Sequence, residues 1–280
     1  MTSQHTHNAT TTDGATIAGS VRGDGPPLVF VHGIIGDGGL DWRALLPHLA
    51  DRFTCHLPSL RGRGGSSGDP DLGFGRLVED LLAYVESLPQ AAGLVGWSLG
   101  AGMALTAAGT RPEAVDAVAA IEPGMPGLMN EQEQADLGAA IGRMAELADG
   151  GRHGEAVRAL AGFVFEDDDI ATAENTGYFA AAARYVPAML DFFGQQMQQD
   201  GPVPEDPALL GAITAPVLVL HGSDPTPYVA AGVRQVVDYV ADTQVQEISG
   251  AGHAIPLTHP EALADAIAEF FMNRVLRQEQ

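Results

Sequence analysis

In the sequence GWSLG, residues 96–100, one serine lies between two glycines, directly after the apolar pair Leu94-Val95 and directly before a helix-like segment, 101–108. A serine hydroxyl is a poor nucleophile until a base removes its proton, and it must also stand clear of the backbone. A sharp turn from a strand into a helix meets the second requirement. Glycines at 96 and 100 let such a turn close without clashes of Cβ atoms. The pattern therefore predicts a nucleophile, Ser98, at a strand-to-helix turn.

A second stretch with the same spacing, GGSSG at residues 64–68, lacks this context. Arginine and glycine precede it at 61–63 and Asp69-Pro70 follows it, so both flanks are typical of loops. We therefore expect Ser66 to have no nucleophilic role.

The rest of the chain alternates between short apolar runs and amphipathic segments. The runs are typical of buried parallel strands and cover residues 28–31, 53–57, 94–96, 115–121, 217–221 and 244–248. Apolar residues recur at helical spacing over 42–49, 77–88 and 263–275. The pair Asp13-Gly14 predicts a hairpin that leads into a strand at 16–21. The alternation predicts an α/β fold with a mostly parallel sheet and helices on both faces.

The alternation is interrupted once, between residues 123 and 215, where no convincing strand occurs. We expect an inserted helical cap with helices at 131–147, 154–165, 172–185 and 187–198. The predicted domains are therefore a core, 1–122 with 214–280, and a cap, 123–213. The aromatic and methionine side chains of the cap are expected to pack in its interior and against the sheet, and the alternative is that several of them line a substrate pocket.

The cap also contains an acidic run, Glu166-Asp167-Asp168-Asp169. Its spacing is not that of a calcium-binding loop, so we expect a solvated loop there and predict no metal site.

A nucleophilic serine needs an imidazole base, and nine histidines are available. Only His253 lies in a glycine-rich loop, GAGH at 250–253, between the last predicted strand and the final helix. A side chain there can reach the carboxyl edge of the sheet, so we assign His253 as the base. Among the other histidines, we expect His5, His7 and His153 to be exposed and His48 to lie on a helix. We expect His56 and His221 to pack in or beside strands.

Backbone donors for a developing oxyanion are predicted in two places. The segment VHGI, residues 31–34, makes a tight turn directly after a strand and is followed by a glycine-rich loop. We predict that the N–H groups of Ile34 and Leu99 form the oxyanion hole, with Leu99 at the positive end of the helix after Ser98. His32 is expected to anchor the loop and not to act as an acid or base.

Four segments, taken in chain order, resemble the α/β-hydrolase fold superfamily: His32-Gly33, LRGRG at 60–64, GWSLG at 96–100 and Gly252-His253. The resemblance spans the chain apart from the cap, and it implies an eight-stranded, mostly parallel sheet. An aspartate often stands in this family where the chain has Ser59. We expect altered loop bonding there without loss of activity.

The resemblance leaves two carboxylates as candidates for the acid that orients His253. The family most often places its acid after the strand predicted at 217–221, where Asp224 lies. Asp224, however, is two residues after Gly222 and not three, and Pro225 fills the expected position. Glu122 follows the preceding strand, as the acid does in other members of the superfamily. Glu122 is slightly favoured, and Asp224 stays open as the alternative.

These residues predict a serine hydrolase that cleaves a carboxylic ester or lactone of a small, moderately apolar molecule through an acyl-enzyme, without a cofactor. A weaker resemblance to zearalenone-type lactone hydrolases rests on Glu122-Pro123, 222–227 and 253–256. The alternatives on the same scaffold are C–C bond hydrolysis, cofactor-free perhydrolysis and a non-catalytic ligand-binding protein. A dinucleotide-binding oxidoreductase is disfavoured because the glycines at 33–39 lack the G-x-G-x-x-G spacing.

Composition narrows the partners. The 280 residues carry 14 basic and 36 acidic side chains, a net charge of −22, and no lysine. Such an excess repels phosphates and anionic lipids, so we expect neither nucleic acid nor a membrane surface as a partner. Residues 1–12 lack the pattern of a secretory signal, and the single Cys55 cannot form an internal disulfide, so a cytoplasmic protein is expected. The sequence leaves the oligomeric state open, a homo-oligomer included.

Overall fold

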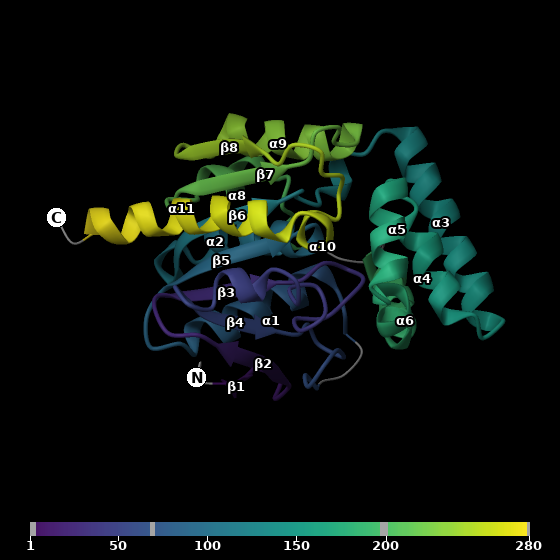
Figure 1. Ribbon diagram of the computed structural model, residues 1–280, viewed down its shortest axis with the longest axis horizontal. Helices are drawn as coiled ribbons and strands as arrows, with labels where there is room; N and C mark the ends of the chain where they lie inside the picture. The colour runs from purple at the N-terminus through teal and green to yellow at the C-terminus, as the bar shows by residue number, and fades with distance from the viewer. Residues whose placement is uncertain (1–3, 68–70, 197–200, 279–280) are drawn as a thin grey trace.

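One eight-stranded sheet forms the centre of the protein. The computed structural model describes residues 4–67, 71–196 and 201–278. The sheet has the strand order β1-β2-β4-β3-β5-β6-β7-β8 (Figure 1). Its strands are β1 (Gln4–Thr10), β2 (Thr16–Arg22), β3 (Pro27–Val31), β4 (Thr54–Pro58), β5 (Ala92–Trp97), β6 (Val115–Ile121), β7 (Val217–His221) and β8 (Thr243–Glu247). β2 is antiparallel to both its neighbours, β1 and β4, and the other pairings are parallel.

The predicted mostly parallel sheet is therefore confirmed, and so is the hairpin, since Thr10 pairs with Thr16 across the turn that contains Asp13-Gly14. The central strands read as continuous apolar runs because both faces of the sheet are covered. In β3, Leu28 and Phe30 join the apolar core on one face, and Val29 and Val31 join the core on the other.

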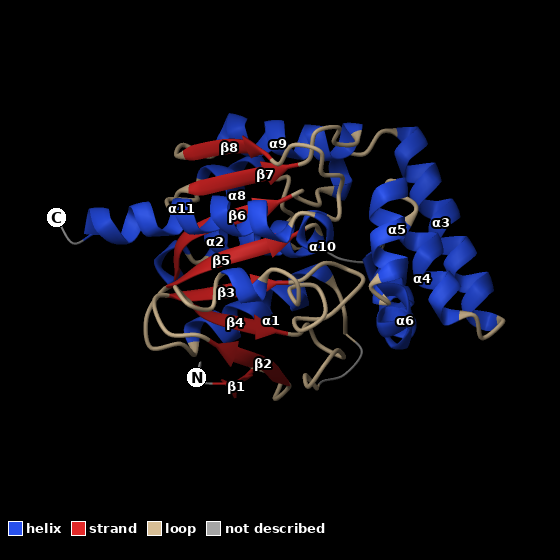
Figure 2. Ribbon diagram, viewed as in Figure 1, coloured by secondary structure: helices blue, strands red, loops and turns tan. Residues whose placement is uncertain are grey.

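Helices cover both faces of the sheet (Figure 2). A row of four packs in sequence on one face: α1 (Phe74–Glu86), α2 (Leu99–Thr110), α8 (Pro207–Gly211) and α9 (Pro227–Tyr239). The other face carries α11 (Pro260–Gln278) and the short 3-10 helix η1 (Leu46–His48), while α10 (Ile255–Thr258) precedes α11 at the sheet edge. Two further one-turn helices are η2 (Pro112–Ala114) and η3 (Pro126–Leu128). Among the described helices, none combines the length and the apolar composition needed to cross a bilayer.

The helical insertion lies between β6 and β7, as expected. It comprises α3 (Glu131–Asp149), α4 (His153–Ala161), α5 (Asp167–Asn175), α6 (Tyr178–Ala182), η4 (Ala183–Tyr185) and α7 (Val186–Gln196). Figures 1 and 2 show α3 to α6 beyond the arrowheads of the parallel strands, so this cap lies over the carboxyl edge of the sheet. The exact domain boundaries, 122/123 and 213/214, stay a prediction.

Three local predictions were wrong. Residues 42–49 form turns and one turn of 3-10 helix instead of an α-helix, with Pro47 inside η1, where it lacks an N–H to donate. The single helix expected at 172–185 is divided, because Gly177 adopts a left-handed conformation (φ 70°) between α5 and α6. The acidic run at 166–169 is no solvated loop: Glu166 caps α5, and Asp169 is buried.

Candidate active site

Ser98 is held in a strained turn between β5 and α2. Its φ of 54° and ψ of −116° lie outside the regions that non-glycine residues usually adopt. Its N–H donates to Ile121 O (2.9 Å), and its carbonyl accepts from Gly124 N (3.0 Å). A Cβ on Gly100 would overlap the carbonyl oxygen of Val31, which explains the glycine at that position. The half-buried side chain of Ser98 lines a cavity.

The loop after β3 borders the same cavity. Ile34 and Leu99, the two residues predicted to supply oxyanion donors, both line it together with Ser98. This is a consequence of topology, because β3 and β5 are parallel neighbours and their carboxyl ends meet at one edge.

His32 fastens the loop after β3 to the core. Its Nε2 accepts from Leu60 N (2.9 Å), and its Nδ1 contacts Gly33 O (2.7 Å). Burial lowers the pKa of His32 to about 3, so the ring is neutral. These contacts fit the anchoring role predicted for His32.

His253 and Glu122 meet in the interior. Nδ1 of His253 lies 3.0 Å from Oε2 of Glu122, and the exposed fractions of the two residues are 5% and 2%. Because Nδ1 faces a carboxylate, the neutral ring carries its proton there and leaves Nε2 as the base. The other carboxylate oxygen, Oε1 of Glu122, accepts from Gly222 N (2.7 Å). Glu122 also has a positive φ, 49°, directly after β6.

Asp224, the alternative acid, is exposed in the turn after β7. Within the described ranges it makes no hydrogen bond to His253, whereas Glu122 does. The structure therefore brings Glu122, and not Asp224, to the imidazole.

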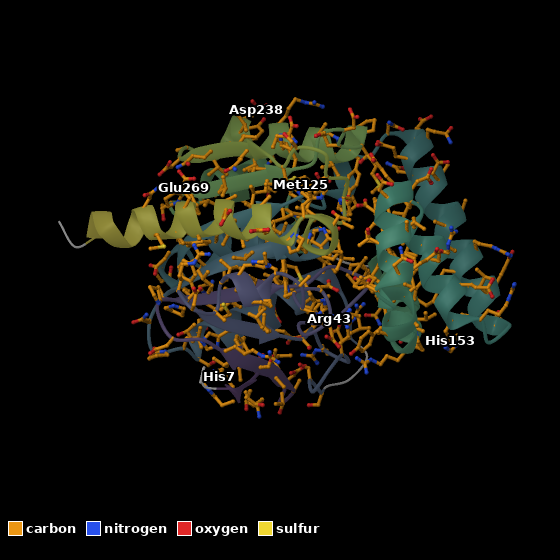
Figure 3. The ribbon with its side chains drawn as sticks, in the orientation of Figure 1. His7, Arg43, Met125, His153, Asp238 and Glu269 are labelled. Atoms are coloured by element: carbon orange, nitrogen blue, oxygen red, sulfur yellow. The ribbon has the colours of Figure 1, made fainter. Side chains whose placement is uncertain are left out.

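The Ser98 turn and the histidine loop are directly linked. Trp97, the residue before Ser98, donates its Nε1–H to the carbonyl of His253 (2.9 Å), and the two rings lie 6.0 Å apart. Two other histidines lie away from this site: Figure 3 shows His7 at the β1 side of the molecule and His153 at the outer end of the cap, both partly exposed.

The cavity has a volume of about 400 Å³ and is enclosed mostly by apolar side chains. The cap contributes Leu137, Leu160, Phe163, Phe192 and Phe193. Of the cap's other aromatic residues, Phe165, Tyr178 and Phe179 pack in the apolar core. The described lining contains one carboxylate, Glu205, and no arginine or histidine. Burial raises the pKa of Glu205, whose Oε2 has no hydrogen-bond partner among the residues that the structure describes.

The sequence predicted none of the polar contacts between the cap and the core, and two of these contacts hold the loops of the site. Asp41, fully buried, accepts from Gly33 N (2.9 Å) and from the hydroxyl of Tyr178 on α6 (2.8 Å). Asp169 on α5 accepts from Ala254 N (3.2 Å) in the histidine loop. The sequence does not indicate that Asp41 contacts Tyr178 or that Asp169 contacts Ala254, because the two members of each pair lie far apart in the chain. The contact of Asp41 with Gly33 spans only eight residues and could have been predicted.

The sequence pattern of the Alpha/beta hydrolase family matches residues 28–266, and the chain belongs to this family. It is similar, at 39% identity over 114 residues, to a pimeloyl-acyl-carrier-protein methyl ester esterase of Methylococcus capsulatus, an alignment that spans 38% of this chain and 43% of that enzyme. It is 27% identical over 272 residues to 2-(acetamidomethylene)succinate hydrolase of Mesorhizobium japonicum, covering 89% of each. In structure it resembles 2-hydroxy-6-oxo-6-phenylhexa-2,4-dienoate hydrolase of Rhodococcus sp. strain RHA1, with a TM-score of 0.71, 22% identity and coverage of 96% and 100%.

Proposed function

We propose that the protein is a serine hydrolase that cleaves a carboxylic ester or lactone of a small, moderately apolar molecule. Ser98 is the nucleophile, His253 the base and Glu122 the acid that orients it. The observation that carries the proposal is the buried 3.0 Å contact of His253 with Glu122, in a loop hydrogen-bonded to the residue before Ser98. The esterase similarity over part of the chain supports the same reaction class.

The proposed reaction has two halves. His253 Nε2 takes the proton of Ser98 as Oγ attacks the carbonyl carbon, and the N–H groups of Ile34 and Leu99 stabilise the oxyanion. His253 then protonates the leaving oxygen, which departs as an alcohol or, in a lactone, stays attached as a hydroxyl of the acyl group. In the second half His253 deprotonates water, which attacks the acyl-enzyme and releases the acid and Ser98. None of these steps requires a cofactor.

The cavity supports an uncharged substrate. Its lining offers mainly apolar side chains and, in the described part, no cation that would hold a carboxylate. Glu205, the carboxylate of the described lining, would repel an anion when ionised. The Mesorhizobium relative is named for a succinate, and the Rhodococcus enzyme for a dienoate, so we infer that this chain differs from both in substrate.

The test uses wild type and Ser98→Ala on neutral aryl esters of rising chain length, on lactones of rising ring size, and on a vinylogous 1,5-diketone that reports C–C hydrolysis. We expect ester or lactone turnover that falls by about 10⁶-fold in kcat for Ser98→Ala, as in other triads. Fluorophosphonate should label the wild type at Ser98. Folded wild type that is neither labelled nor active would make the protein a ligand-binding member of the family.

A further inference from the structure

A carboxylate of the cap reaches into the loop that carries His253. Asp169 is the third residue of α5, and its exposed fraction is 1%. Its Oδ2 accepts from Ala254 N (3.2 Å) and from Glu166 N (3.3 Å), so one of its two donors is the residue directly after His253. A Cβ on Gly252 would lie 2.5 Å from Oδ2, so the carboxylate is packed directly against the loop backbone.

A buried carboxylate in this position needs an explanation. Burial raises the pKa of Asp169, and the described residues offer it no arginine partner. Two backbone donors, Ala254 N and Glu166 N, compensate the carboxylate for its lost hydration. The contact therefore fixes the main chain directly after the histidine that the proposed reaction uses.

The cap also contacts the histidine ring. Phe165, four residues before Asp169, lies with its ring centroid 6.1 Å from that of His253 and stacks on Trp97 at 6.2 Å. Figure 1 shows α5 on the side of the cap that faces α10, the helix that begins two residues after His253. One short segment of the cap, 165–169, thus contacts both the ring of this histidine and the backbone directly after it.

We propose that Asp169 is a positioning residue for His253, a role that rests on the function proposed above. Glu122 fixes the ring through Nδ1, and Asp169 fixes the main chain through the N–H group of Ala254 and its packing against Gly252. The cap, beyond enclosing substrate, completes the catalytic geometry. Without the carboxylate, the buried N–H of Ala254 loses its acceptor and the loop relaxes away from Ser98.

The experiment compares Asp169→Leu, which removes the acceptor, with Asp169→Asn, which keeps an oxygen in place of Oδ2. We expect Asp169→Leu to lower kcat about 10- to 100-fold with little change in KM, because a misplaced base affects the chemical step. Asp169→Asn should restore most of kcat. Asp168→Asn, an exposed neighbour on the same helix, is the matched control and should behave as wild type.

A second readout does not depend on activity. Amide hydrogen exchange of the segment 250–256 should be faster in Asp169→Leu than in wild type, and close to wild type in Asp169→Asn. If no substrate is turned over, the proposed function fails while the exchange measurement still tests the anchor. Unchanged kcat and exchange in Asp169→Leu would overturn the inference, as would a rise in KM alone or an Asp169→Asn variant as impaired as Asp169→Leu.

Discussion

Oε2 of Glu122 lies 3.0 Å from Nδ1 of His253, although 131 residues separate them in the chain. Glu122 directly follows β6 and has a positive φ, and its other oxygen accepts from the N–H of Gly222, which directly follows β7. The acid therefore follows β6, the strand next to β5, which precedes Ser98. The residue after β7 supplies a backbone N–H to this acid and does not supply the acid itself.

Substitutions of Glu122 and Asp224, the two candidates for the acid, are expected to have clearly different effects on kcat. Glu122→Gln keeps the size of the side chain but presents an amide to Nδ1, which disturbs the tautomer that leaves Nε2 basic. We expect kcat to fall by about 10⁴-fold, as in other triads that lose their acid. Asp224→Asn should change kcat by no more than about twofold, since surface substitutions rarely matter. If Asp224→Asn lowers kcat on an aryl ester far more than Glu122→Gln does, Asp224 is the acid that orients His253.

The glycine at position 100 is expected to be indispensable to the fold. Gly100→Ala would push a Cβ into the Val31 carbonyl, and overpacking of this kind costs about 1–3 kcal/mol of unfolding free energy. Gly138→Ala is the matched control, because Gly138 lies exposed within α3 with open space around it. That variant should gain about 0.5–1 kcal/mol. Urea unfolding of both variants measures the difference, and equal stabilities would contradict the packing argument.

The cavity predicts discrimination by charge. A neutral aryl ester should be hydrolysed with a kcat/KM about tenfold or more above that of an equally long ester ending in a carboxylate, because no described lining residue offers a cation. Glu205→Gln should lower the ratio of kcat/KM for the neutral ester to that for the anionic ester, because it removes the negative charge that repels the anionic ester. Asp238→Asn, an exposed acid on α9 (Figure 3), makes the same change in net charge far from the cavity and should leave the ratio unaltered. A preference for the anionic ester would be incompatible with this view of the cavity.

The sequence was informative where one local pattern sufficed. Glycines around Ser98 and the alternation of apolar runs predicted the turn and the sheet, because both depend on neighbouring residues. Glu122 was favoured only through a family resemblance, since apolar spacing does not show which strand end faces His253. The acidic run at 166–169 was misread because a helix cap and a solvated loop share a composition; only the packing of the cap on the core makes Asp169 buried.

The burial of Asp41 is expected to make stability depend on pH. Burial raises the pKa of Asp41 to about 7, against the lowering effects of Tyr178 and Gly33. In the unfolded chain the pKa returns to its ordinary value of 3.8, so between about pH 4 and 7 the folded protein holds a proton that the unfolded chain has lost. The contribution of Asp41 to the unfolding free energy should therefore decrease as pH rises through this window, by at most about 1.4 kcal/mol per pH unit, and stay level above it.

Asp41→Asn is neutral throughout and keeps an acceptor for Gly33. Urea unfolding at pH 5, 6, 7 and 8 measures this effect. The unfolding free energy of Asp41→Asn minus that of the wild type should rise with pH up to about pH 7. Asp238→Asn is the control for the change in net charge. A difference between wild type and Asp41→Asn that stays constant or moves the other way would show that Asp41 is ionised in the folded protein across this range.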